Sequence, residues 1–179
     1  MKNKTKNTDS PGASRNSPDQ KIVIERTFKA SVKDLWDLWT TKEGLESWWG
    51  PEGFVTIICK LDPRPGGGFA YEMKATGKEQ VEALKKANLP LTSKAHGTYI
   101  EVTPYRRLAY LTLADFIPGV TPYDVGAVID FHAIPQGVRL TITEDTMHNE
   151  EWTKMSEMGM SSSLDKLAKV LEGRRGGTG

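Results

Sequence analysis

The sequence lacks most of the features that mark specialised classes of protein. It has a single cysteine, Cys59, so no internal disulfide can form, and the alternating apolar run around it predicts a small buried hydrophobe. The 24 basic and 23 acidic side chains nearly cancel, which gives no net field to favour nucleic acid or a membrane surface. No apolar run is long enough to span a bilayer, and none follows the N-terminal lysines as in a secretory signal. These absences predict a cytoplasmic protein.

Motifs for phosphate, metal or catalytic chemistry are also scarce. The glycines at 66–68 lead into a strand rather than a helix, so they indicate a turn and not a phosphate loop. The three histidines share no ligand spacing with the cysteine or a carboxylate pair, so neither a metal nor a cofactor is expected. Asp130 and His132 share the polar face of a strand, and Glu144 and Asp145 are interpreted as linker charge. No catalytic residue is predicted, and enzymatic activity stays an open alternative.

Tryptophan, in contrast, is concentrated in one place. Four of the five tryptophans fall within fourteen residues, in the stretch SVKDLWDLWTTKEGLESWWGP. Ser31 and Thr40 are each followed by an acidic residue three positions later, which predicts two short capped helices. The Gly-Pro step after the last ring ends the second helix. We expect most of these rings in a core, with Trp48 or Trp49 at the rim of a binding cavity.

Alternating apolar and polar residues predict seven strands joined mainly by short turns. The predicted strands cover 21–29, 55–61, 69–75, 96–103, 108–113, 125–131 and 138–142. A long helix over 150–172 follows, with Asn149 as its cap. The polar segments 1–20 and 173–179 are expected to be disordered, which leaves one domain over 21–172.

The predicted last helix carries one broad apolar face and several small residues. Its apolar face comprises Trp152, Met155, Met160, Leu164, Leu167 and Leu171. Gly159 and the serines at 161–163 are poor helix formers. Such residues fit either a helix that passes close to a strand or a helix with room for a guest beneath it.

The order of one strand, two helices, six strands and a long helix resembles the helix-grip fold of the START-like superfamily, which includes birch-pollen allergen and polyketide cyclases. Within it, the chain is similar to the family named after the activator of the heat-shock protein 90 ATPase. The similar segments cover nearly all of residues 22–172 and include WWGP, DPRPGGGFAYEM, HGTYIEVTPYRRLAYL and GVRLTITE. The resemblance implies an α+β helix-grip fold, in which a seven-stranded antiparallel sheet wraps around the C-terminal helix and leaves a cavity between them.

Two departures from the family pattern bear on that cavity. The segment 77–95 replaces a brief turn, and its Val81 and Leu84 predict a short amphipathic helix. That helix is expected to form a lid with the apolar loop around Phe116, or else to be an inert surface elaboration or a dimer contact. Met160 stands where the family often has tryptophan, which leaves a more adaptable side chain facing the cavity.

The combined interpretation is a binding module that takes a small, largely apolar molecule under the last helix. The expected cavity residues are Trp49, Ile57, Tyr71, Met73, Ile100, Phe116, Ile129, Leu140, Met155, Met160 and Leu164. One alternative, implied by the family name, is a co-chaperone that activates the heat-shock protein 90 ATPase. The other is a cyclase- or hydrolase-like enzyme that uses the same cavity. Neither ligand identity nor oligomeric state follows from the sequence.

Overall fold

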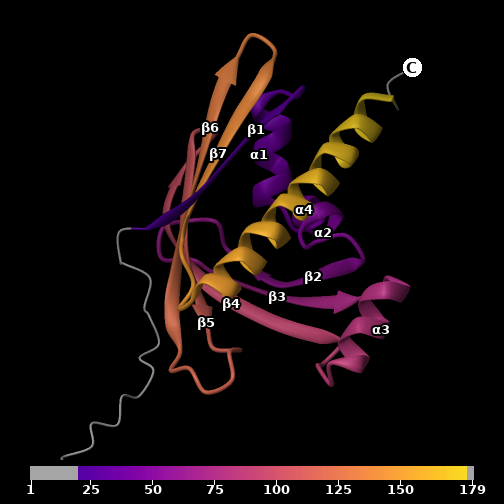
Figure 1. Ribbon diagram of the computed structural model, residues 1–179. Coiled ribbons are helices and arrows are strands. Elements are labelled where there is room, and N and C mark those ends of the chain that lie inside the picture. The colour runs from indigo at the N-terminus through magenta and orange to yellow at the C-terminus, as the bar shows by residue number, and fades with distance from the viewer. Residues whose placement is uncertain (1–19, 177–179) are drawn as a thin grey trace, which may run out of the picture.

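The structure, a computed structural model, describes residues 20–176 (Figure 1). The strands are β1 Lys21–Phe28, β2 Phe54–Leu61, β3 Gly68–Ala75, β4 Thr92–Thr103, β5 Arg107–Ala114, β6 Tyr123–Ile134 and β7 Gly137–Asp145. The helices are α1 Val32–Thr40, α2 Lys42–Trp48, α3 Lys78–Lys86 and α4 Glu150–Gly176. The tails expected to be disordered lie outside the described residues at 1–19 and 177–179. The prediction for 173–176 is wrong, because α4 continues there with basic residues that suit a helix C-terminus.

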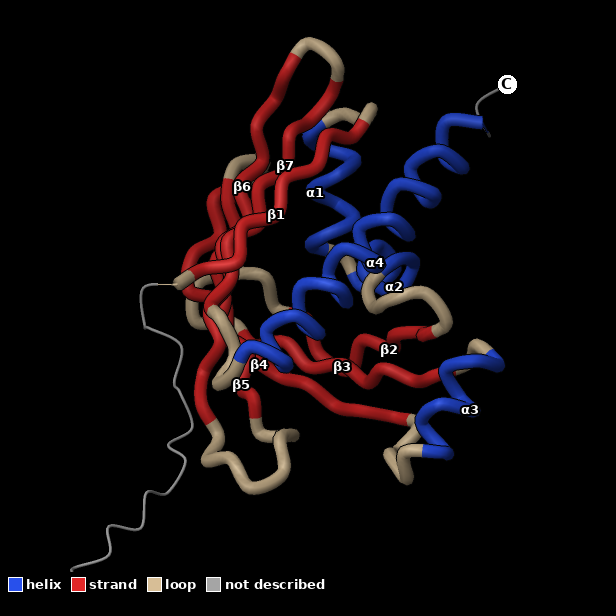
Figure 2. The backbone as a smooth tube through the Cα atoms, viewed as in Figure 1, coloured by secondary structure: helices blue, strands red, loops and turns tan. Residues whose placement is uncertain are grey.

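One antiparallel sheet carries all seven strands in the order β1-β7-β6-β5-β4-β3-β2. Figure 2 shows the sheet curving around α4, with α1 and α2 on the same concave side. Consecutive strands from β2 to β7 are neighbours, and β1 closes the order by pairing with β7. This is the α+β helix-grip fold that the sequence predicted.

The core lies between the concave face of the sheet and the C-terminal half of α4. Leu164, Leu167 and Leu171 of α4 are 1%, 0% and 6% exposed, and they pack in one cluster with the inward residues of β6 and β7. Trp48 is fully buried and donates its indole N–H to the Leu38 carbonyl at 2.9 Å. Most of the tryptophan-rich segment is therefore core, as expected.

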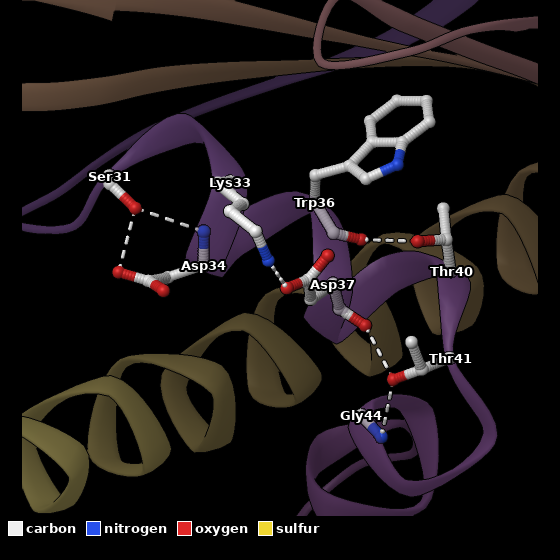
Figure 3. Close-up of polar contacts among 8 residues, drawn as sticks. All are labelled: Ser31, Lys33, Asp34, Trp36, Asp37, Thr40, Thr41 and Gly44. Atoms are coloured by element: carbon white, nitrogen blue, oxygen red, sulfur yellow. Dashed lines mark hydrogen bonds and ion pairs between the residues drawn. The ribbon is translucent and has the colours of Figure 1, made fainter.

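The caps of the two short helices place that segment, and one of them differs from the prediction (Figure 3). Ser31 caps α1, accepting from the Asp34 amide at 3.0 Å. The second cap is Thr41, whose hydroxyl oxygen accepts from the Gly44 amide at 3.1 Å. Thr40 was predicted for this role, but it is the last residue of α1 and donates to the Trp36 carbonyl instead. The acidic residue three positions after Thr40 favoured the wrong threonine, because a capping hydroxyl needs only a backbone amide and the Gly44 amide serves Thr41.

Strand β2 faces the core with the opposite set of residues from the one predicted. Thr56 and Ile58 are buried, whereas Ile57 is 50% exposed and Cys59 is also exposed. Thr56 points inward because its hydroxyl donates to the Trp49 carbonyl at 2.7 Å. The expected burial of Cys59 is therefore wrong. A bulge after Ile58 shifts the alternation by one residue, so that Leu61 at the end of the strand faces inward as predicted.

The segment 77–95 does contain a helix, α3, but it does not meet the Phe116 loop. The amides of Thr76 and Gly77 donate to the Gly53 carbonyl at 2.8 and 2.9 Å, which ties α3 to the turn before β2. Figure 1 shows α3 beyond the ends of β3 and β4, apart from the β5–β6 loop. None of its residues is buried. The predicted lid of these two segments is wrong, since they cover different parts of the molecule.

Candidate functional site

A cleft of about 410 Å³ opens beneath the N-terminal half of α4. We call it the outer cleft. The sheet side supplies Tyr71 and Met73, and the α2–β2 turn supplies Trp49. The helix supplies Trp152, Met155, Ser156, Gly159, Met160 and Ser163. Apart from two serine hydroxyls and the tyrosine, the walls of the outer cleft are apolar.

The outer cleft lies along the N-terminal half of α4, where the helix is less buried. Leu164, Leu167 and Leu171 nearer the C-terminus are at most 6% exposed, whereas Met155, which lines the cleft, is 47% exposed. A side chain added at Gly159 would meet no atom within 4 Å. Gly159 therefore borders open space and does not mark a close approach to a strand, whereas Ser162 accepts a hydrogen bond from the Glu52 amide and Ser163 is buried.

The open space at Gly159 predicts a stabilising substitution. Gly159→Ala is expected to raise the free energy of unfolding by about 0.5–1 kcal/mol, because alanine loses less backbone entropy in a helix. Gly44→Ala in α2 is the matched control and is expected to destabilise, since its new Cβ would lie 2.5 Å from the Asp37 carbonyl. Urea unfolding of both variants checks the pair. A loss of stability in Gly159→Ala would mean that the helix sits closer to its neighbours.

Deeper in the fold lies a second, smaller space of about 40 Å³, which we call the inner pocket. Trp49 and Tyr71 line both the outer cleft and the inner pocket, and their rings meet edge to face with centroids 6.1 Å apart. Phe69, Tyr99, Leu108, Tyr110 and Thr112 belong to the inner pocket alone. The Trp49–Tyr71 ring pair thus stands at the junction of the two spaces.

Glycine at position 97 helps to build the inner pocket. A Cβ there would lie 2.4 Å from the Phe69 ring, so the ring crosses β4 only because no side chain is present. Phe69 then packs edge to face on Tyr99 and on Tyr110, each at 5.4 Å. The aromatic wall of the inner pocket follows from this crossing.

A buried carboxyl, that of Glu144, lies on the same concave face. The alternation of β7 through Val138, Leu140 and Ile142 continues inward to this residue, which is 8% exposed. Glu144 pairs with Ala127 of β6, which in turn pairs with Tyr110 of β5. The interpretation of Glu144 as linker charge is therefore wrong. Its burial could have been predicted by extending the apolar alternation of β7 by two residues.

Burial changes the ionisation of Glu144 and of the tyrosines near it. Burial, and secondarily the charge of Asp145, raises the pKa of the Glu144 carboxyl from about 4.5 to about 7. Burial also raises the pKa of the Tyr110 hydroxyl well above its usual value, and the charge of Glu144 adds to the effect. The pKa of Tyr71 is raised by burial and by Glu144, with an opposing contribution from a hydrogen bond to Trp49. Glu144 is thus electrostatically coupled to two hydroxyl-bearing side chains of the inner pocket.

Two buried polar atoms of this region lack a hydrogen-bond partner within residues 20–176. They are Oε2 of Glu144 and Nε1 of Trp39, and the Trp39 side chain lines the inner pocket. Buried polar groups normally have partners, because desolvation without one costs about 1–3 kcal/mol. The unpartnered Trp39 donor belongs to a lining residue of the inner pocket, and the unpartnered Glu144 acceptor lies on the same concave face without lining either space.

The structure brings together six of the eleven cavity residues expected from the sequence. The outer cleft is lined by Trp49, Tyr71, Met73, Phe116, Met155 and Met160. Ile129, Leu140 and Leu164 are at most 1% exposed and belong to the packed core. Ile57 and Ile100 point away, being 50% and 55% exposed. Ile57 follows the inverted phase of β2, and Ile100 is the extra residue of a bulge between Tyr99 and Glu101. Whether a ligand contacts the six lining residues stays a prediction.

Other groups at the site went unrecognised in the sequence. In the outer cleft these include Met147 and Trp152, of which Trp152 was assigned only to the apolar face of the last helix. In the inner pocket they include Tyr99 and Tyr110. Each lies in a strand of alternating apolar and polar residues, a pattern from which its inward orientation could have been predicted. Across residues 20–176, no group of three or more His, Cys, Asp or Glu side chains is placed to hold a metal ion. No helix of the same range is long and apolar enough to cross a membrane.

The curved sheet, the gripped helix and the cleft between them define a helix-grip domain of the START-like class. The sequence profile of the activator of Hsp90 ATPase homolog 1-like proteins matches residues 29–172. The chain belongs to this family. A comparison with curated proteins gave no match.

Solved structures share the fold at low sequence identity. A Chromobacterium violaceum protein is similar with a TM-score of 0.70 and 24% identity, over 85% of this chain and 96% of its own. The AHSA1 protein of Silicibacter pomeroyi has a TM-score of 0.68 and 22% identity, over 86% of this chain and 98% of its own. An AHSA1-like protein of Aeromonas hydrophila has a TM-score of 0.66 and 18% identity, with coverages of 87% and 94%. At these identities the similarity establishes the fold alone.

Proposed function

We propose that this protein binds a small, largely apolar molecule in the outer cleft beneath α4. The carrying observation is the cleft itself, about 410 Å³ between an aromatic and methionine-rich helix face and the sheet. That volume lies within the range of about 300–1,000 Å³ typical of small-molecule sites, which are mostly apolar with a few polar groups. Methionine side chains suit such a site because they adapt to guests of different shape. The cytoplasmic location expected from the sequence stays a prediction.

The outer cleft is tested by filling it. In the wild type, an apolar probe at about 100 times its dissociation constant is expected to stabilise the fold by about 2.7 kcal/mol. That corresponds to a rise in Tm of about 5–10 °C for a domain of this size. Met160→Trp is expected to abolish the rise, because the indole would occupy space that Met160 now borders. Differential scanning calorimetry with and without probe measures both quantities.

Met158→Trp is the matched control, since Met158 lies on the same helix and is 72% exposed. It is expected to respond to the probe as the wild type does. A different result would contradict the proposal: if Met160→Trp destabilises the protein by about 1–3 kcal/mol, the site is packed and the new ring does not fit. An unchanged probe response in Met160→Trp would place the binding elsewhere.

The family description supports a second candidate, activation of a heat-shock protein 90 ATPase. Binding to the purified chaperone, followed by its ATPase rate, would test that role directly. The enzymatic alternative would need converging acid and base groups in the cavity. Glu144 acts electrostatically on Tyr71 and Tyr110, but it is not among the lining residues of either space, and no other carboxyl or histidine is.

A further inference from the structure

We propose that the inner pocket recognises the polar end of the ligand, accepting a hydrogen-bond donor such as a hydroxyl or an amine and excluding a carboxylate. This inference rests on the proposed function, because the apolar body of the same molecule would occupy the outer cleft. The ligand class is therefore an aliphatic or aromatic alcohol or amine, and not a fatty acid.

The geometry places Glu144 beside the inner pocket. Glu144, Ala127 and Tyr110 form one inward row across β7, β6 and β5, and strands in a sheet are about 4.8 Å apart. The middle residue of the row is an alanine, whose single methyl group leaves the flanking side chains free to approach over it. Tyr110 lines the inner pocket, and the charge of Glu144 acts on its hydroxyl, so the carboxyl lies behind this wall although Glu144 is not itself a lining residue.

The unpartnered atoms define what the inner pocket would bind. Oε2 of Glu144 is an acceptor and Nε1 of Trp39 is a donor, and neither has a partner among the described residues. A ligand hydroxyl can donate to the first group and accept from the second or from a tyrosine. An ammonium group can donate to the carboxylate. The inner pocket, at about 40 Å³, has room for such a head group but not for the body of a ligand.

A carboxylate head group would be repelled where a hydroxyl or an ammonium group is attracted. It would bring a second negative charge close to Glu144 in a region shielded from water, where like charges repel strongly. The polar side chains that line the inner pocket are tyrosine and threonine hydroxyls and the indoles of Trp39 and Trp49, and Lys and Arg do not occur among its lining residues. No cation of the pocket wall therefore offsets the repulsion.

Access to the inner pocket runs past the Trp49–Tyr71 ring pair. Both side chains line both spaces, so a ligand that spans the outer cleft and the inner pocket would pass between or displace these rings. Gly50 follows Trp49 with a positive φ of 97°, which turns the chain immediately beside the ring. The junction thus joins the site for the apolar body to the site for the polar head.

The test compares octanol, octylamine and octanoate, which share one apolar chain and differ in the head group. Isothermal titration of the purified full-length wild type at about pH 8, where Glu144 is mostly ionised, is expected to show octanol and octylamine binding at least about tenfold more tightly than octanoate. In Glu144→Gln this discrimination against octanoate is expected to disappear. Glu72→Gln removes a carboxylate that pairs with Lys94 on the opposite face of β3, so it should discriminate as the wild type does.

The outcomes separate this inference from the proposed function. Equal binding of the three compounds to the wild type, abolished by Met160→Trp, would overturn the head-group assignment and leave the apolar site intact. Discrimination that persists unchanged in Glu144→Gln would also overturn it, because another group would then be responsible. Binding of none of them would reject both proposals. The wild-type comparison alone can decide against the inference, so the test does not depend on how well a variant folds.

Discussion

Replacing Glu144 with glutamine is expected to stabilise the protein above about pH 7. The change in the free energy of unfolding caused by the substitution is expected to be about 3 kcal/mol more favourable there than in acid. The folded state raises the pKa of this carboxyl from about 4.5 to about 7, so it holds the proton more tightly than the unfolded chain. The wild type therefore loses stability as pH rises from about 4.5 to about 7, and the loss is complete above that window. Glutamine cannot ionise, so the variant does not suffer this loss.

Urea unfolding at several pH values between about 4 and 8 measures the effect as the difference between variant and wild type. Other groups titrate in both proteins, so their contributions cancel in that difference. The titratable groups coupled to Glu144 are Asp145, Tyr71 and Tyr110, and both tyrosines stay neutral throughout the range. Its strand neighbours on β1 and β6, Ile22 and Ala127, do not ionise.

Glu72→Gln serves again as the control, since it is expected to lack this pH-dependent gain. Parallel stability profiles for wild type and Glu144→Gln would show that the carboxyl is solvated or paired in the folded state. That result would remove the physical basis of the head-group proposal as well.

Leu167→Ala in α4 is expected to cost about 2–5 kcal/mol of unfolding free energy. Leu167 is 0% exposed and lies in the main core cluster, so the substitution removes buried methyl groups and leaves a cavity. The loss is a large fraction of the about 5–15 kcal/mol that typically stabilises a domain. Chemical denaturation is expected to show a lower midpoint with an unchanged slope.

Met158→Ala, on the exposed side of the same helix, is the matched control and should change stability by no more than about 0.5 kcal/mol. The contrast tests whether α4 is part of the core, as the helix-grip fold requires. If Leu167→Ala cost less than the control, the helix would not be part of the core, and it could not form a fixed wall of the outer cleft.

Strand periodicity predicted several faces correctly. Phe69, Tyr71 and Met73 alternate and all line the inner pocket or the outer cleft. The same rule failed on β2, where Ile57 is apolar and yet exposed. A period of two contains no phase information when both faces carry apolar residues, and a bulge then changes the phase within the strand.

Local signals succeeded where the interaction is local. The Ser31 cap and the Asn149 cap, whose Oδ1 accepts from the Trp152 amide at 2.9 Å, follow from side chains that reach two or three residues along the chain. The second helix cap is one residue later than predicted, because the Thr40–Glu43 spacing matched a capping box while the Thr41 hydroxyl met the Gly44 amide. The burial of Glu144 was not predicted, because a charged residue at the end of a strand is usually solvent-exposed although the alternation of β7 placed it inward.

The family, the α+β class and the order of the elements followed from the sequence, since periodicity, capping and turns depend on neighbours along the chain. The position of the outer cleft, in contrast, could not be predicted from the sequence. Met160 and Leu164 are one helical turn apart, yet Met160 lines the outer cleft whereas Leu164 is 1% exposed and packed in the core. The proximity of Glu144 to Tyr71 and Tyr110 likewise depends on strand pairing across β7, β6, β5, β4 and β3, which brings together residues more than thirty positions apart. Pairing register is a property of the packed whole, so only the tertiary structure located the outer cleft and the inner pocket.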